Sequence, residues 1–344
     1  MNFPGLVVIG GSAGALPALL DLVPTLPATF SAPILLTVHT PADQPSALPQ
    51  ILSQAGPLPA RHARQGDLLE PGVIFVAPPN HHLLVVGHHL HLSQGPKENH
   101  ARPAIDVLFR SAAQAYEARV IGVLLSGRLN DGSSGLWTIE QLGGYALIQH
   151  PEEAEAPEML LNALRQVAVK DILPAREIGL RLVELLNHRP YSGGPPPMND
   201  DQRQRLQAEI QVSAGHGTFE KGVRVMGSPS LLTCPECHGV LGQIEEAGLT
   251  RYRCHTGHAF TAEVLLAELG EATEAALWSA ARLLDEQVLL LDQLSQSIQL
   301  DGTLEAGRWV KARRLEARSN ILRQFIQHPE EEGALTLASI PGRF

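Results

Sequence analysis

The chain has 344 residues, of which 44% are hydrophobic and 18% are charged, so it is long enough for two domains with full cores. Its formal net charge of −10 argues against a nucleic-acid partner, because phosphate binding requires a basic surface. No segment has the pattern of a secretory signal, and no run of about 18 apolar residues predicts a membrane span. With only three cysteines, these features predict a cytoplasmic protein without membrane insertion.

Short apolar runs alternate with amphipathic stretches along residues 1–189. The predicted strands are 6–10, 34–39, 73–78, 82–87, 120–127 and 145–150, and the predicted helices are 15–23, 104–117 and 133–143. Near-continuous apolar strands separated by helices predict an α/β fold with a doubly wound, mostly parallel sheet covered on both faces. The runs at 73–78 and 82–87 are predicted to form an antiparallel or mixed edge.

The sequence changes character several times after this α/β region. Residues 190–205 are rich in Pro, Gly and Asp, as expected of a linker, and residues 206–265 contain all three cysteines. Residues 266–330 have the apolar period of amphipathic helices, and residues 331–344 have no clear period. The predicted organisation is therefore an α/β domain, a linker, a small zinc-binding module, a helical region and a tail.

A small-residue motif, GGSAG at residues 10–14, follows the first predicted strand and precedes the first predicted helix. In that context a G-x-S-x-G motif forms a nucleophile elbow, with Ser12 on a sharp turn and backbone N–H groups available to an oxyanion. The alternative is a glycine-rich turn in which Ser12 is an ordinary helix cap. A dinucleotide site is disfavoured, because Ser12 stands where that fingerprint needs glycine and His39, not an acid, ends the second strand.

Two further residues fall at the ends of predicted parallel strands. His39 ends the strand at 34–39, and Asp131 lies in the loop after the strand at 120–127. Because the carboxyl ends of parallel strands lie along one edge of a sheet, Ser12, His39 and Asp131 are expected to converge there as nucleophile, base and orienting acid. His150 ends another strand on the same edge and is the alternative base.

The order of these residues separates two hydrolase classes. An α/β-hydrolase has its histidine last, whereas His39 here precedes Asp131. The order, together with blocks such as VVIGGSAGALPAL, VHTPADQPSALPQIL, ARPAIDVLFRSAA and VIGVLLSGRLNDGSSGL, resembles the catalytic domain of CheB-type protein-glutamate methylesterases over about residues 5–186. Such enzymes remove methyl esters from chemoreceptor glutamates and deamidate certain receptor glutamines.

The resemblance implies a role for each site residue. Ser12 would attack the ester carbonyl, His39 would take and return its proton, and Asp131 would hold the imidazole. Backbone N–H groups near Ala13 and Arg128 would form the oxyanion hole. Arg102 could bind substrate, with a purely structural role as the alternative. No cofactor is implied for catalysis.

The sequence also departs from the family pattern. Ser126-Gly127-Arg128-Leu129 replaces the family's threonine-glycine-methionine-glycine run before the acid, which could reshape substrate access around main-chain donors. The receiver domain of the family does not occur in this sequence, so activation by phosphorylation of a fused receiver is not expected.

The cysteine-rich segment has the spacing of a structural zinc site. Cys-x2-Cys is followed by residues 238–253 and then by Cys-x3-His, which is the ligand spacing of a ribbon hairpin. The predicted ligands are Cys234, Cys237, Cys254 and His258. His255 and His238 are the second and third choices for the fourth ligand, and three buried free cysteines are the alternative without metal.

The sequence therefore predicts a serine hydrolase that cleaves protein L-glutamate methyl esters, and that could deamidate glutamines, on a chemoreceptor or other methylated protein. The alternative is a non-catalytic scaffold that binds partners through its zinc module and helices. Apolar residues at heptad-like positions in 265–294 predict either packing on the module or a homo-oligomeric coiled coil.

Overall fold

A computed structural model describes residues 3–188, 198–216, 227–246, 249–297 and 302–327. The chain divides into two compact units, with the boundary after Leu265. The predicted tail at 331–344 and residues 190–197, which are half of the predicted linker, lie outside the described residues. No described helix has the length and apolarity that crossing a membrane would require.

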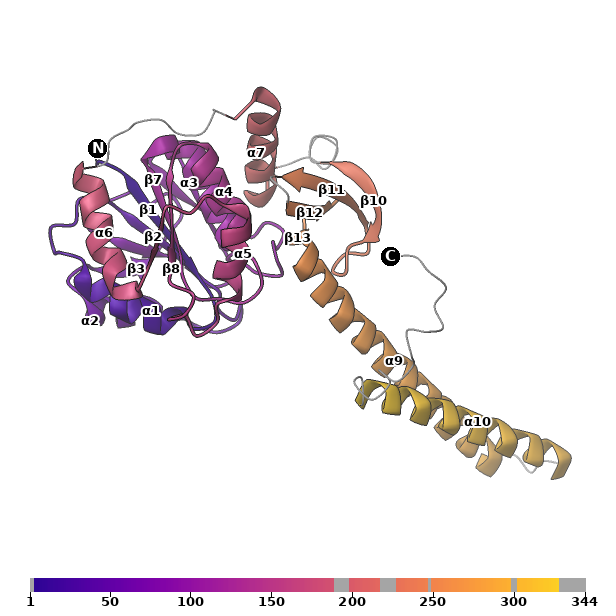
Figure 1. Cartoon of the computed structure of the whole chain (residues 1–344). Helices are drawn as coiled ribbons and strands as arrows, with labels where there is room; N and C mark the ends of the chain where they lie inside the picture. The colour runs from indigo at the N-terminus through magenta and orange to yellow at the C-terminus, as the bar shows by residue number, and fades with distance from the viewer. Residues whose placement is uncertain (1–2, 189–197, 217–226, 247–248, 298–301, 328–344) are drawn as a thin grey trace. The chain divides into compact units, whose positions relative to one another are not determined.

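A seven-stranded parallel sheet forms the centre of the first unit (Figure 1). Its strand order is β3-β4-β2-β1-β7-β8-β9, and every neighbouring pair is parallel. The strands are β1 (Leu6–Gly11), β2 (Ile34–Val38), β3 (Ala60–His62), β4 (Ile74–Val76), β7 (Val120–Leu124), β8 (Tyr145–Gln149) and β9 (Asp171–Leu173). The strand order reverses beside β1, and ligands of open α/β sheets bind at the carboxyl ends of the strands at such a point.

Helices cover both faces of this sheet, each over its own apolar core. Alternate β1 side chains enter opposite cores, Leu6 and Val8 one, Val7 and Ile9 the other, because the side-chain period of a strand is two. The first core is covered by α3 (Ile105–Tyr116), α4 (Ser133–Gln141) and α5 (Glu158–Gln166), and the second by α1 (Ala15–Leu22), α2 (Leu48–Ala55) and α6 (Ala175–His188). Short 3₁₀ turns follow two helices at Val23–Thr25 and Glu117–Arg119. The predicted doubly wound fold is confirmed.

The predicted antiparallel edge at 73–87 is wrong in one respect. β4 lies inside the sheet, parallel to both neighbours, whereas β5 (His82–Val86) and β6 (His89–Ser93) form a separate two-stranded hairpin. The hairpin packs its buried Leu83 and Leu84 into the core beneath α3, and the Val85 N–H donates to Ser111 Oγ of that helix at 3.1 Å. The sequence predicted a strand at 82–87 but could not indicate which layer this strand joins.

A small antiparallel sheet follows α7 (Asp200–Ser213), which begins within the segment predicted as linker. An Asn199–Gln202 capping box starts this helix there. The sheet has the order β10-β11-β12-β13, and we call it the ribbon module. Its strands are β10 (Ser228–Thr233), β11 (Val240–Glu246), β12 (Leu249–Cys254) and β13 (Ala259–Thr261).

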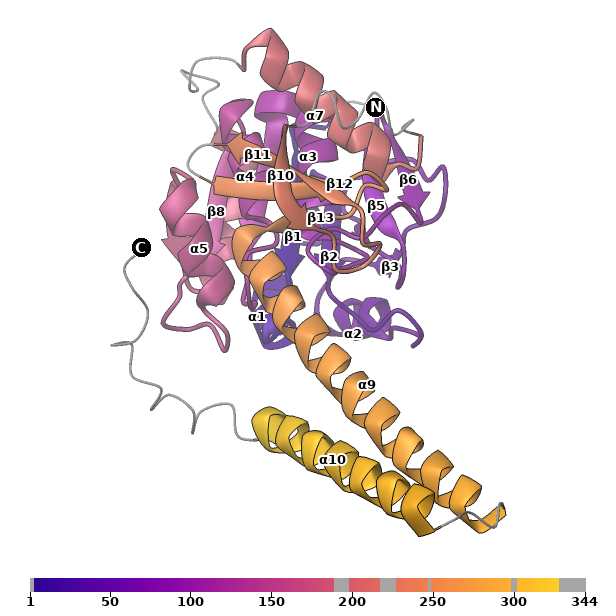
Figure 2. The same ribbon diagram turned by 90° about the vertical axis from the view of Figure 1, so that its right-hand side faces the viewer.

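Two long helices, α9 (Ala262–Ser297) and α10 (Gly302–Gln327), lie side by side with opposite directions (Figure 2). Ser319 Oγ donates to the Ala281 carbonyl, and Arg308 Nη1 donates to the Leu294 carbonyl at 3.0 Å. Ala281 and Leu315 are buried in this helical hairpin. The predicted amphipathic region therefore forms an antiparallel pair within the second unit.

Candidate functional site

The turn that carries Ser12 is fixed by close packing at the end of β1. A Cβ on Gly10 would lie 2.2 Å from Ile105 Cγ2, so only glycine lets the start of α3 approach this strand. Gly14 adopts φ 72°, and a Cβ there would lie 2.5 Å from Glu155 Cβ. The Ser12 N–H donates to the Ser126 carbonyl at 2.9 Å, which ties the turn to the loop after β7.

Ser12, His39 and Asp131 form one chain of hydrogen bonds. Ser12 Oγ lies 3.1 Å from His39 Nδ1, and His39 Nε2 lies 2.8 Å from Asp131 Oδ2. The predicted convergence of three strand ends thus occurs, with Nδ1 rather than Nε2 facing the serine. The alternative base His150 instead accepts a hydrogen bond from the Glu152 N–H at 3.3 Å.

Asp131 is buried, and its carboxylate is surrounded by donors. Its Oδ2 accepts from the Ile105 N–H at 2.7 Å, and its Oδ1 accepts from the Asp106 N–H at 3.2 Å, both in the first turn of α3. Burial opposes ionisation, but the hydrogen bond and charge of His39, with these N–H groups and Asn99, hold the pKa of Asp131 below its usual range. Asp131 is therefore anionic and fixed at a helix N-terminus.

Sequence reasoning missed a second buried carboxyl beside the acid. Asp106 Oδ1 accepts from the Gly135 N–H at 2.6 Å, and its Oδ2 accepts from Asn99 Nδ2 at 3.2 Å. Burial, and then the neighbouring Asp131, raise the pKa of Asp106 to about 8. An acid on the buried face of a predicted helix is the sequence signal that could have identified it.

The backbone around Ser12 has two donors that face no protein acceptor. Within the described residues, the Ala13 and Arg128 N–H groups donate to no backbone or side-chain acceptor. A Cβ on Gly127 would lie 3.0 Å from Ser12 Cβ, so the Arg128 loop packs directly against the serine. These unpaired N–H groups suit a developing oxyanion.

Arg102, the predicted substrate residue, is engaged in local structure. Its guanidinium donates to Asn80 Oδ1 at 2.7 and 2.9 Å and to the carbonyls of Gln94 and Gly95 at 3.0 and 2.8 Å. These contacts brace the loop that leads into α3. A role in substrate binding stays a prediction.

Comparisons with known proteins match the α/β domain. The sequence model of the family described as CheB methylesterase matches residues 7–182, about half of the chain. The chain belongs to the CheB methylesterase family. The crystal structure of the Thermotoga maritima CheB methylesterase catalytic domain is similar to this chain, with 30% sequence identity and a TM-score of 0.51. The match covers 53% of this chain and 98% of that domain.

Two curated relatives show how much of the chain the family accounts for. A Leptospira interrogans protein, provisionally named protein-glutamate methylesterase/protein-glutamine glutaminase, is 36% identical over 186 residues, which are 54% of this chain and 96% of the relative. A Caulobacter vibrioides protein-glutamate methylesterase/protein-glutamine glutaminase 2 is 38% identical over 183 residues, but this chain spans only 51% of it. The family match ends before α7 and the ribbon module.

Outside the CheB methylesterase match, the ribbon module brings three cysteines and a histidine together. Their ligand atoms all lie within 4.8 Å of one another, so the cluster could hold one metal ion. Its members are Cys234, Cys237, Cys254 and His258. The two alternative ligands, His255 and His238, are exposed and lie outside the cluster.

The chemistry of this cluster favours a metal. Burial opposes ionisation of Cys254, but hydrogen bonds from His258 and Thr256 lower the pKa of its thiol to about 5. The Cys254 partner, in turn, raises the pKa of His258 to about 9. His258 Nε2 lies 3.4 Å from Glu236 Oε2, which leaves Nδ1 for the metal and supplies an orienting carboxylate. Three sulfurs and one imidazole, with no open position, are the ligand set of a closed tetrahedral site.

Proposed function

We propose that the chain is a protein-glutamate methylesterase that uses Ser12, His39 and Asp131 as its catalytic triad. The observation that carries the proposal is the hydrogen-bonded chain from Ser12 Oγ through His39 to Asp131, in a domain of the CheB methylesterase family. The family supports the reaction class, and the order of the hydrogen bonds supports the proposed roles of nucleophile, base and acid.

The reaction proceeds in two steps, acylation of Ser12 and hydrolysis of the acyl-serine. Ser12 Oγ attacks the γ-ester carbonyl while His39 Nδ1 takes the hydroxyl proton, and the backbone N–H groups of Ala13 and Arg128 stabilise the oxyanion. The tetrahedral intermediate collapses, methanol leaves with the proton from His39, and an acyl-serine remains. Water, deprotonated by His39, then hydrolyses the acyl-serine to release glutamate and restore the Ser12 hydroxyl.

Asp131 keeps the imidazole oriented throughout. Its bond to His39 Nε2 leaves Nδ1 without a proton in the resting site and stabilises the imidazolium that forms. No cofactor takes part in this reaction. We also propose Arg102, in the loop that leads into α3, as a substrate contact.

The proposed substrate is a methylated glutamate on a chemoreceptor or a similar signalling protein. The curated relatives carry this activity in their names, together with protein-glutamine glutaminase. A glutamine side chain presents the same acyl group with ammonia as leaving group, so the site could also deamidate. We place the reaction in the cytoplasm, where reduced cysteines persist.

The Cys/His cluster is proposed to hold a structural zinc ion. Cys234, Cys237, Cys254 and His258 would fill all four positions, so the ion would stabilise the ribbon module and take no part in ester hydrolysis. The helical hairpin is a proposed site of homo-oligomerisation. Its exposed large apolar side chains include Leu283, Leu289, Leu290, Trp309, Ile321 and Phe325.

Methanol release from a methylated chemoreceptor tests the function directly. The wild-type chain is expected to release methanol, and Ser12→Ala is expected to lower kcat by about a thousandfold or more with folding intact. A serine-directed fluorophosphonate should label the wild type only. A wild type that neither labels nor hydrolyses any ester would instead support a scaffold without catalysis.

A further inference from the structure

The ribbon module is paired with the loop before α3. The Asn99 N–H donates to the Ala259 carbonyl at 2.7 Å, and the Ala259 N–H donates to the Lys97 carbonyl at 3.2 Å. Residues 97–99 thus lie along β13, the strand that directly follows the cluster residue His258. The module therefore contacts the α/β domain through backbone hydrogen bonds.

The side chain of Asn99 links this contact to the triad. Its Nδ2 donates to Asp131 Oδ1 at 3.1 Å and to Asp106 Oδ2 at 3.2 Å, while its Oδ1 accepts from the Thr261 N–H at 3.1 Å. Since Oδ2 of Asp131 holds His39, the position of Oδ1 decides whether the carboxylate faces the imidazole correctly. Asn99 thus fixes the far oxygen of the acid.

The residue before the acid is held by the same strand. Asn130 is fully buried, and its Oδ1 accepts a hydrogen bond from Thr261 Oγ1. Its Nδ2 donates to Glu263 Oε2 at 2.9 Å, at the start of α9. Asn130 therefore bonds directly to residues that the family match, which ends at residue 182, does not contain, and Asp131 is linked to such a residue through Asn99.

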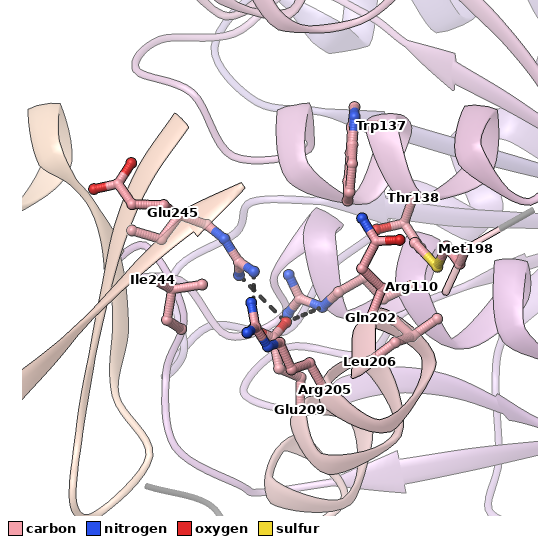
Figure 3. Close-up of a pocket in the computed structure, with 11 residues that line it drawn as sticks. Arg110, Trp137, Thr138, Met198, Gln202, Arg205, Leu206, Glu209, Ile244 and Glu245 are labelled. Carbon is pink, nitrogen blue, oxygen red and sulfur yellow. Dashed lines mark hydrogen bonds and ion pairs between the residues drawn. The ribbon is translucent and has the colours of Figure 1, made fainter. Parts of the chain in front are cut away.

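A buried ionic cluster fixes the register of this contact, and Figure 3 shows the part of it where Glu209 meets Arg110. Glu98 is paired with Arg110 of α3 and, at 2.9 Å, with Arg253 of β12. Glu209 of α7 is paired with Arg251 of β12 at 2.8 Å. All five side chains are nearly inaccessible to solvent, so breaking one pair would leave an uncompensated buried charge. The module therefore has one defined position beside Asn99.

We propose that Asn99 is a positioning residue for ester hydrolysis and that the ribbon module is an integral support of the catalytic acid. β13 holds Asn99 and Asn130, and these two residues hold Asp131 against His39. The proposal rests on the proposed function, since it concerns the same triad.

Two substitutions at Asn99 test whether the residue acts by donating hydrogen bonds from Nδ2 or only by filling space. Asn99→Asp keeps the size of the side chain and the acceptor for Thr261, but it replaces the amide donor by a carboxylate beside the carboxyl groups of Asp106 and Asp131. Asn99→Ala removes the donor without adding charge. We expect kcat to fall about tenfold in the alanine variant and further in the aspartate variant, with KM within about twofold of wild type. An aspartate variant more active than the alanine variant would contradict a donor role.

A third substitution tests the module's side of the contact. Thr261→Val conserves shape but removes the hydroxyl that donates to Asn130, so kcat is expected to fall severalfold while bound metal per chain and KM stay unchanged. Thr273→Val, which removes an exposed hydroxyl bonded to the Leu269 carbonyl, is the matched control. Equal kcat in both threonine variants would overturn the supporting role of the module.

The outcomes distinguish this inference from the function on which it rests. A wild type without esterase activity refutes the proposed function. An active wild type with kcat unchanged in both Asn99 variants refutes only the positioning role. Because Thr261 lies outside the α/β domain, its variant remains a decisive test if the Asn99 variants fail to fold.

Discussion

The triad and the Cys/His cluster are two polar sites that the fold holds in different ways. Ser12, His39 and Asp131 come from the ends of three strands between two large apolar cores. Among its described residues, the ribbon module buries only three large apolar side chains, those of Leu241, Ile244 and Phe260. Packing therefore positions the triad, whereas the proposed metal in the cluster would help to stabilise the module that carries it.

The largest expected effect is the loss of the base. His39→Gln should lower kcat by about a thousandfold or more, because no other described group accepts the Ser12 proton. Melting temperature should change little, since the two cores are untouched. His150→Gln is the matched control on the same sheet edge and should retain wild-type methanol release. Equal losses of kcat in both variants would contradict the assignment of His39 as the base.

Loss of one cluster ligand should instead lower the stability of the ribbon module. Cys254→Ser is expected to abolish stoichiometric metal binding and to melt the ribbon module at a lower temperature, because ligand bonds replace a core there. His255→Ser, next in sequence but outside the cluster, should keep about one metal per chain. Elemental analysis and thermal unfolding of both variants measure this directly. A stable, metal-free Cys254→Ser module would show that the ribbon module does not need a metal to fold.

The sequence predicted both sites because their geometry follows from simple patterns. Strand-end positions placed His39 and Asp131 on one edge, and the Cys-x2-Cys and Cys-x3-His spacings defined the cluster. Asn99 and Asp106 were not predicted, because their roles depend on how residues 97–99 pair with β13. That register is set by three-dimensional pairing, and no local period contains it.

The same limit explains the errors in the predicted fold. β3 and β9 have only three residues each, too few for a periodic signal, and both were missed. The strand at 82–87 was predicted, but its pairing with β6 and its packing on α3 instead of the sheet edge depend on tertiary contacts. Three helices of the α/β domain, α2, α5 and α6, were also not predicted from the sequence.

The buried acids that join the two regions predict a stability maximum in mildly acidic solution. Burial opposes their ionisation, but Arg110 lowers the pKa of Glu98 far below its usual range, and Arg251 lowers that of Glu209 to about 2. Both glutamates therefore stabilise the folded state above their unfolded pKa of about 4.3, and this stabilisation is lost as pH falls below it. Asp106 has a raised pKa of about 8, so its contribution is lost as pH rises from about 4 to 8.

The free energy of unfolding of the metal-loaded protein, measured from pH 3 to pH 8, checks both the expected loss of stability in acid and the expected loss toward pH 8. Unfolding free energy should peak near pH 5 and fall by about 2–4 kcal/mol toward pH 3. Asp106→Asn should flatten the limb between pH 5 and 8 and leave the acid limb in place. A wild type whose stability is constant across this range would show that the ionic cluster does not contribute to the junction.

The smallest expected effect concerns Arg102, in the loop between the two sites. Its guanidinium makes hydrogen bonds to Asn80 and to the carbonyls of Gln94 and Gly95, and lysine cannot reproduce this planar set. Arg102→Lys should therefore cost about 1 kcal/mol of stability and change KM for the methylated substrate by less than about twofold. A KM raised tenfold with unchanged stability would instead assign Arg102 to substrate binding, and the loop would then serve the triad alone.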